Sequence, residues 1–193
     1  MSRFPAILAL AAALILSACY PPVTSHQVGT TVGIKNDPAV VGVWRAPGDK
    51  EHRPTYLHFL PRLEGPMAVL MVEGGPQPDG DWNEVSVTTA RFGTFGFMNA
   101  RLISGNGKSI EDQPEGTIPL LYRFGAKGRL LLYLPDETAT KAAIKAGKIK
   151  GTITDNGKGD AVITADGAAL DKFLASPAGQ ALYIKPTTFT RVE

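Results

Sequence analysis

Residues 82–103 decide the fold, and they read WNEVSVTTARFGTFGFMNARLI. In the first half of this stretch, Val85 and Val87 alternate with polar side chains, which is the period-two pattern of a half-buried strand. The second half continues with the same period. We therefore predict two successive strands, Trp82–Phe92 and Phe95–Ile103.

Runs of similar character flank this stretch on both sides. Each is short and apolar, and turn residues such as Gly105–Gly107 and Asn156-Gly157 separate them. The runs comprise residues 40–45, 56–60, 67–73, 117–124, 129–134, 149–154, 161–164 and 187–192. Because about ten strands in a flat sheet would leave damaging edges, closure is favoured. We expect a mainly β fold, with an antiparallel curled sheet that forms a β-barrel or half-barrel.

Two short helices are predicted to interrupt the strands. The first covers Glu137–Ala146 and is capped by Asp136. The second covers Gly167–Ser176, with Asp166 as its cap, and leucine and phenylalanine side chains line one of its faces. Helices of this length are able to cover an opening in a curled sheet.

The N-terminus has the layout of a secretory signal peptide. Arg3 precedes about a dozen apolar residues, too few to span a bilayer, which takes about 20. The run ends in Leu16-Ser17-Ala18-Cys19, which resembles the lipobox of bacterial lipoproteins residue for residue. The resemblance implies cleavage between Ala18 and Cys19, diacylglycerol on the Cys19 sulfur and acylation of the new amino group.

Cys19 is the single cysteine of the chain. One unpaired thiol is unusual in a secreted protein, and lipidation would account for it. The alternative is an ordinary cleaved signal, with Cys19 present by chance. Tyr20 follows Cys19 where an Asp would signal retention, so resemblance to the sorting rules of Gram-negative cells implies the outer membrane, facing the periplasm. The expected partner is the membrane, through acyl chains that contribute about 0.8 kcal/mol per buried CH₂.

The composition divides the chain into three parts. Residues 1–18 are the predicted signal peptide, residues 19–38 the lipidated cysteine and a flexible tether, and residues 39–193 a single β-rich domain. Proline, glycine, serine and threonine are frequent in the tether, as in linkers. About 19 flexible residues would hold the domain on the order of 25 Å from its anchor. An alternative makes residues 27–34 an edge strand.

The charge of the chain does not favour a nucleic-acid partner. There are 20 Lys and Arg against 18 Asp and Glu, and Arg3 leaves with the signal, so the mature net charge is 19 − 18 = +1. Nucleic-acid binding usually needs a concentrated basic face. One basic run is interpreted as a solvated face, with anionic lipid head groups as the alternative partner. It consists of Lys141, Lys145, Lys148, Lys150 and Lys158.

Gly42-Val43-Trp44 opens the predicted domain. The triplet is similar to the Gly-x-Trp of lipocalins, a resemblance that implies a first strand whose tryptophan plugs the closed end of a barrel. The later Thr-Asp-Tyr triplet of that family is missing, and the alternative makes Trp44 an ordinary core residue. A half-barrel like that of outer-membrane lipoprotein carriers fits the predicted architecture equally well.

The sequence contains no recognisable catalytic, cofactor or metal motif. His26, His52 and His58 have no acidic or thiol partner at ligand spacing. There is no Gly-x-Ser-x-Gly elbow. A Gly-Lys-Ser at residues 107–109 lacks the glycine five residues earlier that a phosphate loop requires. We expect a non-catalytic protein without cofactor or metal.

Several aromatic side chains are candidates for the lining of a pocket in the curled sheet, with plain core packing as the alternative. They are Trp44, Trp82, Phe92, Phe95 and Phe97. We expect an envelope lipoprotein that binds an apolar or amphipathic small molecule, or a lipid. The alternative is a structural or protein-binding envelope module, such as an assembly factor or an inhibitor.

Overall fold

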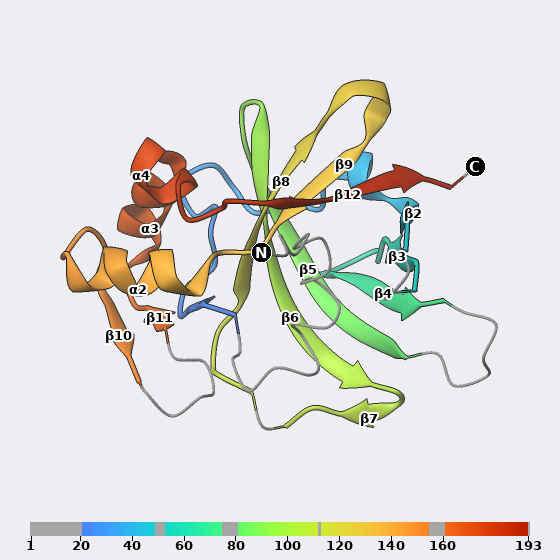
Figure 1. The fold of residues 1–193 in the computed structure, drawn as a ribbon, viewed down its shortest axis with the longest axis horizontal. Coiled ribbons are helices and arrows are strands. Elements are labelled where there is room, and N and C mark those ends of the chain that lie inside the picture. Colours follow the sequence, from blue (N-terminus) through green and yellow to red (C-terminus); the bar gives the residue numbers. More distant parts are fainter. Residues whose placement is uncertain (1–20, 49–52, 75–80, 112, 155–160, 193) are drawn as a thin grey trace, which may run out of the picture.

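The computed structural model describes residues 21–48, 53–74, 81–111, 113–154 and 161–192. Strands dominate, and the helices α2, α3 and α4 gather on one side (Figure 1). The strands are β1 (Val23–Thr24), β2 (Gly42–Ala46), β3 (Thr55–Leu60), β4 (Met67–Glu73), β5 (Trp82–Phe92), β6 (Phe95–Gly105), β7 (Lys108–Ser109), β8 (Ile118–Phe124), β9 (Leu130–Tyr133), β10 (Gly151–Ile153), β11 (Ala161–Ile163) and β12 (Pro186–Arg191). The helices are η1 (Pro38–Val40), η2 (Ala126–Gly128), α2 (Glu137–Lys145), α3 (Gly167–Ala175) and α4 (Pro177–Gln180).

Eight strands form a closed antiparallel β-barrel, which confirms the predicted fold class and selects the barrel over the half-barrel. The order around the barrel is β5-β4-β3-β2-β12-β9-β8-β6, and pairing of β5 with β6 closes it. Barrel strands that are consecutive in the chain are neighbours in the barrel. The last of them, β12, pairs with β9 on one side and with the first strand, β2, on the other. The predicted strands at residues 149–154 and 161–164 lie outside the barrel, because β10 and β11 form a small sheet with β1.

The two ends of the barrel differ. At one end, here called the closed end, short turns join β3 to β4, β5 to β6 and β8 to β9, and η1 precedes β2. The β5–β6 and β8–β9 hairpins stand together at this end in Figure 1. At the other end, here called the mouth, the connections are longer. The longest of them, between β9 and β12, contains the helices α2, α3 and α4 and the strands β10 and β11.

Alternating side chains on the barrel strands supply two apolar layers. On β6, Met98 and Ala100 face the barrel interior, whereas Phe97 belongs to a second cluster outside it. This second cluster, here called the outer layer, packs the outer faces of β6 and β8 against α2, α3 and the segment that follows α4. Leu170 and Leu174 are fully buried contributions of α3. The sheet is therefore apolar on both faces wherever the helices cover it.

The two predicted helices are confirmed within one residue at their ends. The side chain of Asp136 accepts a hydrogen bond from the amide of Ala139, and Asp166 does the same for Ala169, so both are N-caps. The four-residue helix α4 was not predicted. Pro177 lies in its first turn, a position that favours proline.

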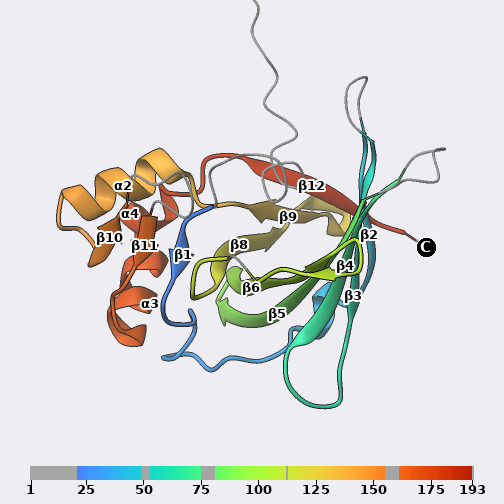
Figure 2. The ribbon, with the colours of Figure 1, turned by 90° about the horizontal axis from the view of Figure 1, so that it is seen from below.

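Residues 21–38 fold onto the barrel, and the predicted flexible tether is wrong for this segment. Val23 and Val28 are buried, and β1 pairs in parallel with β11. The segment, here called the strap, then runs along the outside of the barrel to η1 (Figure 2). Residues 27–34 are turns and irregular backbone rather than the alternative edge strand, and a single bridge joins Lys35 to Thr89.

Two buried polar side chains from distant parts of the chain hold the strap. Asn99 on β6 accepts a hydrogen bond from the Val28 amide (2.7 Å) and donates one to the Val28 carbonyl (3.0 Å). Asp171 on α3 is only 2% exposed and accepts bonds from the amides of Gly29 (2.6 Å) and Thr31 (2.7 Å). The strap's backbone is thus satisfied by groups 71 and 142 residues away, which explains why local composition misleads.

Within the residues that the structure describes, no helix has the length and apolar character needed to cross a membrane.

Candidate functional site

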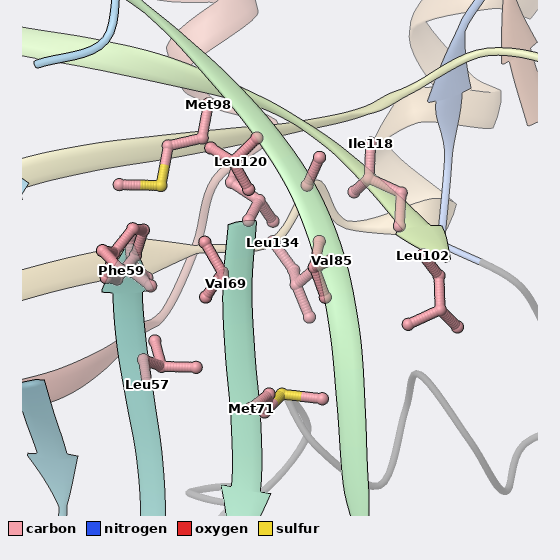
Figure 3. Close-up of a pocket in the computed structure, with 13 residues that line it drawn as sticks. Leu57, Phe59, Val69, Met71, Val85, Met98, Leu102, Ile118, Leu120 and Leu134 are labelled. Carbon is pink, nitrogen blue, oxygen red and sulfur yellow. The ribbon is translucent and has the colours of Figure 1, made fainter. Parts of the chain in front are cut away.

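A cavity of about 50 Å³ occupies the barrel interior. All thirteen side chains that line it are apolar (Figure 3). They are Leu57, Phe59, Val69, Met71, Val85, Val87, Met98, Ala100, Leu102, Ile118, Leu120, Leu132 and Leu134. Without a polar group to orient a polar ligand, such a space accepts the apolar part of a molecule.

The cavity extends from the middle of the barrel to the mouth. Leu102 and Ile118 lie near the mouth ends of β6 and β8, and Leu134 directly follows β9. Val85 and Leu134 are only half-buried, so the lining reaches toward solvent at this end. Among the described residues, the part of the lining nearest to solvent therefore lies at the mouth.

Two methionines give the lining the capacity to adapt. Met71 and Met98 are buried and line the cavity from β4 and β6 (Figure 3). An unbranched thioether with three rotatable bonds changes its shape at low cost, unlike the branched side chains around it. A ligand larger than the empty space is thus accommodated most readily where these two side chains lie.

Trp44 seals the closed end of the barrel. Its side chain is 1% exposed, packs near Phe124 with ring centroids 6.2 Å apart, and donates its indole N–H to the Val40 carbonyl of η1 at 2.7 Å. The buried indole thus has its polar atom satisfied, as such groups require. Trp44 therefore lies at the closed end, on the first strand of the barrel.

Arg191 covers Trp44 from outside. Its guanidinium carbon lies 4.3 Å from the Trp44 ring centroid, and its two terminal nitrogens donate to the carbonyls of Val41 (2.6 Å) and Ala39 (2.8 Å). The planar guanidinium therefore links β12 to η1 and to the start of β2, because it stacks on one ring and donates two hydrogen bonds at once.

A polar group adjoins the same end. The Tyr122 hydroxyl donates to Asp37 Oδ2 at 2.8 Å, and Arg91 lies 3.5 Å from that carboxylate and over the Tyr122 ring. Burial, and then the bond to Asp37, raise the pKa of the Tyr122 phenol well above its ordinary value. The phenol stays neutral and acts here as a donor that fastens the strap to the barrel.

The structure does not place the five predicted pocket aromatics around the cavity. Trp44 lies beneath it as the plug, and Trp82 is 38% exposed on the outer face at the mouth. Phe92, Phe95 and Phe97 pack against one another in the outer layer, with centroids 5.7–5.9 Å apart. The alternate positions of the same strand, such as Met98, line the cavity instead. Strand alternation puts Phe97 on the face of β6 opposite to Met98, and this face packs in the outer layer rather than in the barrel interior.

The described residues offer no candidate metal site. They contain no group of three or more His, Cys, Asp or Glu side chains able to hold a metal ion. His58 is half-buried on β3, and His26 is exposed on the strap. His52 lies outside the described residues, as do Ala18 and Cys19 of the predicted cleavage and lipidation site.

The basic run is partly drawn together around a second hollow. Lys148 and Lys150 line an open, shallow groove with Lys172 of α3 and His26 of the strap. Lys141 instead pairs with Glu137 on α2 at 2.7 Å. Lys158 lies outside the described residues. The groove also contains the carboxylate of Asp166, so its charge is mixed.

Comparison of the chain with protein-family models, with curated proteins and with solved structures found no match.

Proposed function

We propose that this protein is a lipid-anchored envelope protein that binds an apolar chain or small apolar molecule in its barrel, with any polar end of the ligand left at the mouth. The observation that carries the proposal is the cavity lining, thirteen side chains without one charged or strongly polar group. An eight-stranded barrel is just wide enough to hold one small ligand, which is the scale proposed here.

The size of the cavity limits the ligand. Its 50 Å³ is about a third of the roughly 150 Å³ of an engineered apolar cavity that takes up benzene. A slender aliphatic chain fits this space better than a ring system, and longer ligands require Met71 and Met98 to change rotamer. We therefore propose an acyl or alkyl chain as the ligand class, with broad tolerance for the polar group attached to it.

The anchor is supported by Leu16-Ser17-Ala18-Cys19 and the apolar run before it. Mass spectrometry of the protein purified from its own envelope tests this part directly. We expect a chain that begins at Cys19 and carries acyl groups. A start at Met1, or a free thiol on Cys19, would contradict the anchor while leaving the ligand proposal intact.

Ligand binding is tested by isothermal titration calorimetry of the domain with fatty acids of increasing length. Ala100→Leu adds three carbons to the cavity wall between Val87 and Ile118 and should weaken binding at least tenfold. Ser86→Leu is the matched control, because Ser86 neighbours Val87 on β5 but does not line the cavity. Equal affinities for the two variants, or no binding by the unmodified domain, would refute a ligand in the barrel.

A further inference from the structure

The anchor site and the mouth of the barrel are joined by very little chain. Cys19 precedes Pro21, the first residue that the structure describes, by two peptide units, and Val23 by four. A fully extended chain spans at most about 3.6 Å per residue, so the Cα of Cys19 lies within about 7 Å of Pro21 and about 14 Å of Val23. A lipid on Cys19 therefore leaves the domain almost no freedom to move away from the membrane.

Val23 and Thr24 lie at the mouth. Val23 is buried in the same apolar cluster as the barrel interior, together with Ile118 at the start of β8. The backbones of Thr24 and Thr117 exchange hydrogen bonds of 2.8 and 3.0 Å, just before β8 begins. Gly116 makes this approach possible, since its φ is +122° and a Cβ there would clash with the Thr24 carbonyl oxygen. The chain thus enters the domain at the mouth and not at the closed end.

The outer wall beside the mouth carries exposed apolar side chains. Trp82 pairs with Val72 across β4 and β5. Ile103 lies on the neighbouring strand β6, at the irregularity in the pairing opposite Glu84 and Val85, two to three residues along the strand from Trp82; all three apolar side chains are exposed. Tryptophan is enriched where proteins meet the interface of a bilayer. The nearby charges have both signs, with Glu73, Asp81 and Glu84 set against Arg62, Arg101 and Lys108. The rim therefore suits a lipid surface of little net charge.

We propose that in the anchored protein the mouth of the barrel faces the bilayer, with Trp82 at the lipid interface and the plug of Trp44 directed away from it. The proposal rests on the lipid anchor proposed above. Its consequence is that a ligand passes between bilayer and cavity without crossing open water. The partner surface is a zwitterionic lipid bilayer.

The two tryptophans make a label-free test possible, because Trp82 lies at one end of the barrel and Trp44 at the other. The lipidated full-length product is reconstituted in phosphatidylcholine vesicles, with and without lipids brominated near the head group, which quench tryptophan on contact. We expect Trp82 emission to shift to the blue and to lose intensity in brominated vesicles. The remaining emission of Trp82→Phe, from the buried Trp44, should be unaffected.

A matched variant reports from the other end. Leu63 is fully exposed in the turn between β3 and β4 at the closed end. The double variant Trp82→Phe with Leu63→Trp therefore moves the exposed indole from the mouth to the closed end, and we expect this introduced indole to escape quenching. Quenching of the introduced indole in the double variant, with Trp82 of the parent unquenched, would overturn the orientation.

Flotation with the vesicles separates the two proposals. A lipidated product that floats but shows equal quenching from both ends leaves the anchor standing and refutes the orientation. A product that does not float refutes the anchor, and the orientation falls with it. Cys19→Ala should remain at the bottom of the gradient and show no quenching.

Discussion

The closed end and the mouth of the barrel are built from the same eight strands but from different chemistry. At the closed end, Trp44 is held by a hydrogen bond to Val40 and is covered by Arg191, and Tyr122 bonds to Asp37. At the mouth the interior is aliphatic and contains an unfilled space. Aromatic and polar contacts thus concentrate where the barrel is sealed. We infer that the closed end supplies stability, whereas the mouth gives up some stability for binding.

The largest expected effect comes from removing the plug. Trp44→Ala should cost about 3–5 kcal/mol of unfolding free energy, because it leaves a cavity beside Phe124 and an unpaired Val40 carbonyl. Trp82→Ala, the same change at the mouth, should cost no more than about 1 kcal/mol, since Trp82 is 38% exposed. Urea unfolding followed by circular dichroism measures both. Similar losses for the two variants would abolish the distinction between the ends.

The strap runs from the mouth to the closed end, so releasing it tests how much this segment contributes to the stability of the barrel. Asp171→Ala leaves the amides of Gly29 and Thr31 without their buried acceptor, and we expect a loss of about 3 kcal/mol. Lys172→Ala, at the exposed neighbouring position of α3, is the control and should be neutral. Hydrogen exchange should show faster exchange at Gly29 and Thr31 in the Asp171 variant. Unchanged protection there would mean that the carboxylate does not hold the strap.

Substitutions of Arg191 test how much a single side chain at the closed end contributes to the free energy of unfolding. Arg191→Ala removes two hydrogen bonds and the stacking on Trp44 and should cost about 2 kcal/mol. Arg191→Lys keeps the charge but not the planar fork, so it should recover less than half of that loss. Lys108→Ala, at the mouth, should lie within about 0.5 kcal/mol of the parent. Full recovery by lysine would show that charge alone matters at this site.

The smallest expected effect is a fall in the free energy of unfolding at alkaline pH. Burial raises the pKa of Tyr122 and also of Tyr183, whose hydroxyl donates to the Pro119 carbonyl on the outer face of β8. Above pH about 10 the unfolded chain releases these protons while the native state keeps them, so stability is full below that pH and falls above it. Tyr122→Phe should cost about 1 kcal/mol at pH 7 and flatten the decline. An equally steep decline in both single Phe variants would assign it to other groups.

Strand positions could be predicted from the sequence because their signals are local. The alternation around Val85 and Val87 located β5, and the caps Asp136 and Asp166 located α2 and α3. Local periodicity shows which residues share a face. It does not show which face is interior when both are apolar. Phe97 and Met98 occupy opposite faces of β6, and only the packing of α3 against the sheet decides that Phe97 lies outside.

The strap could not be predicted for a different reason. Its prolines, glycines and threonines are the residues of linkers, and its order comes from side chains that are far away in the sequence. Nothing in the sequence around Asn99 and Asp171 indicates that their side chains accept hydrogen bonds from the backbone amides of Val28 and Gly29. Gly29 offered one indirect signal: its φ is +113° and any Cβ there would clash with the Cβ of Ala90, so a glycine permits this close approach of chain to sheet.

The return of β12 to β2 has a consequence for the order of events during biosynthesis. Thr190 bonds to Arg45 across 145 residues, so the strand that completes the ring is made long after the one it must meet. A chain that emerges in N-to-C order carries β2 with one unpaired edge until β12 has been made. Such non-local closure makes folding slow and exposes the nascent chain to aggregation. We therefore expect the barrel to close in a late step, after the helical segment that precedes β12 has left the ribosome.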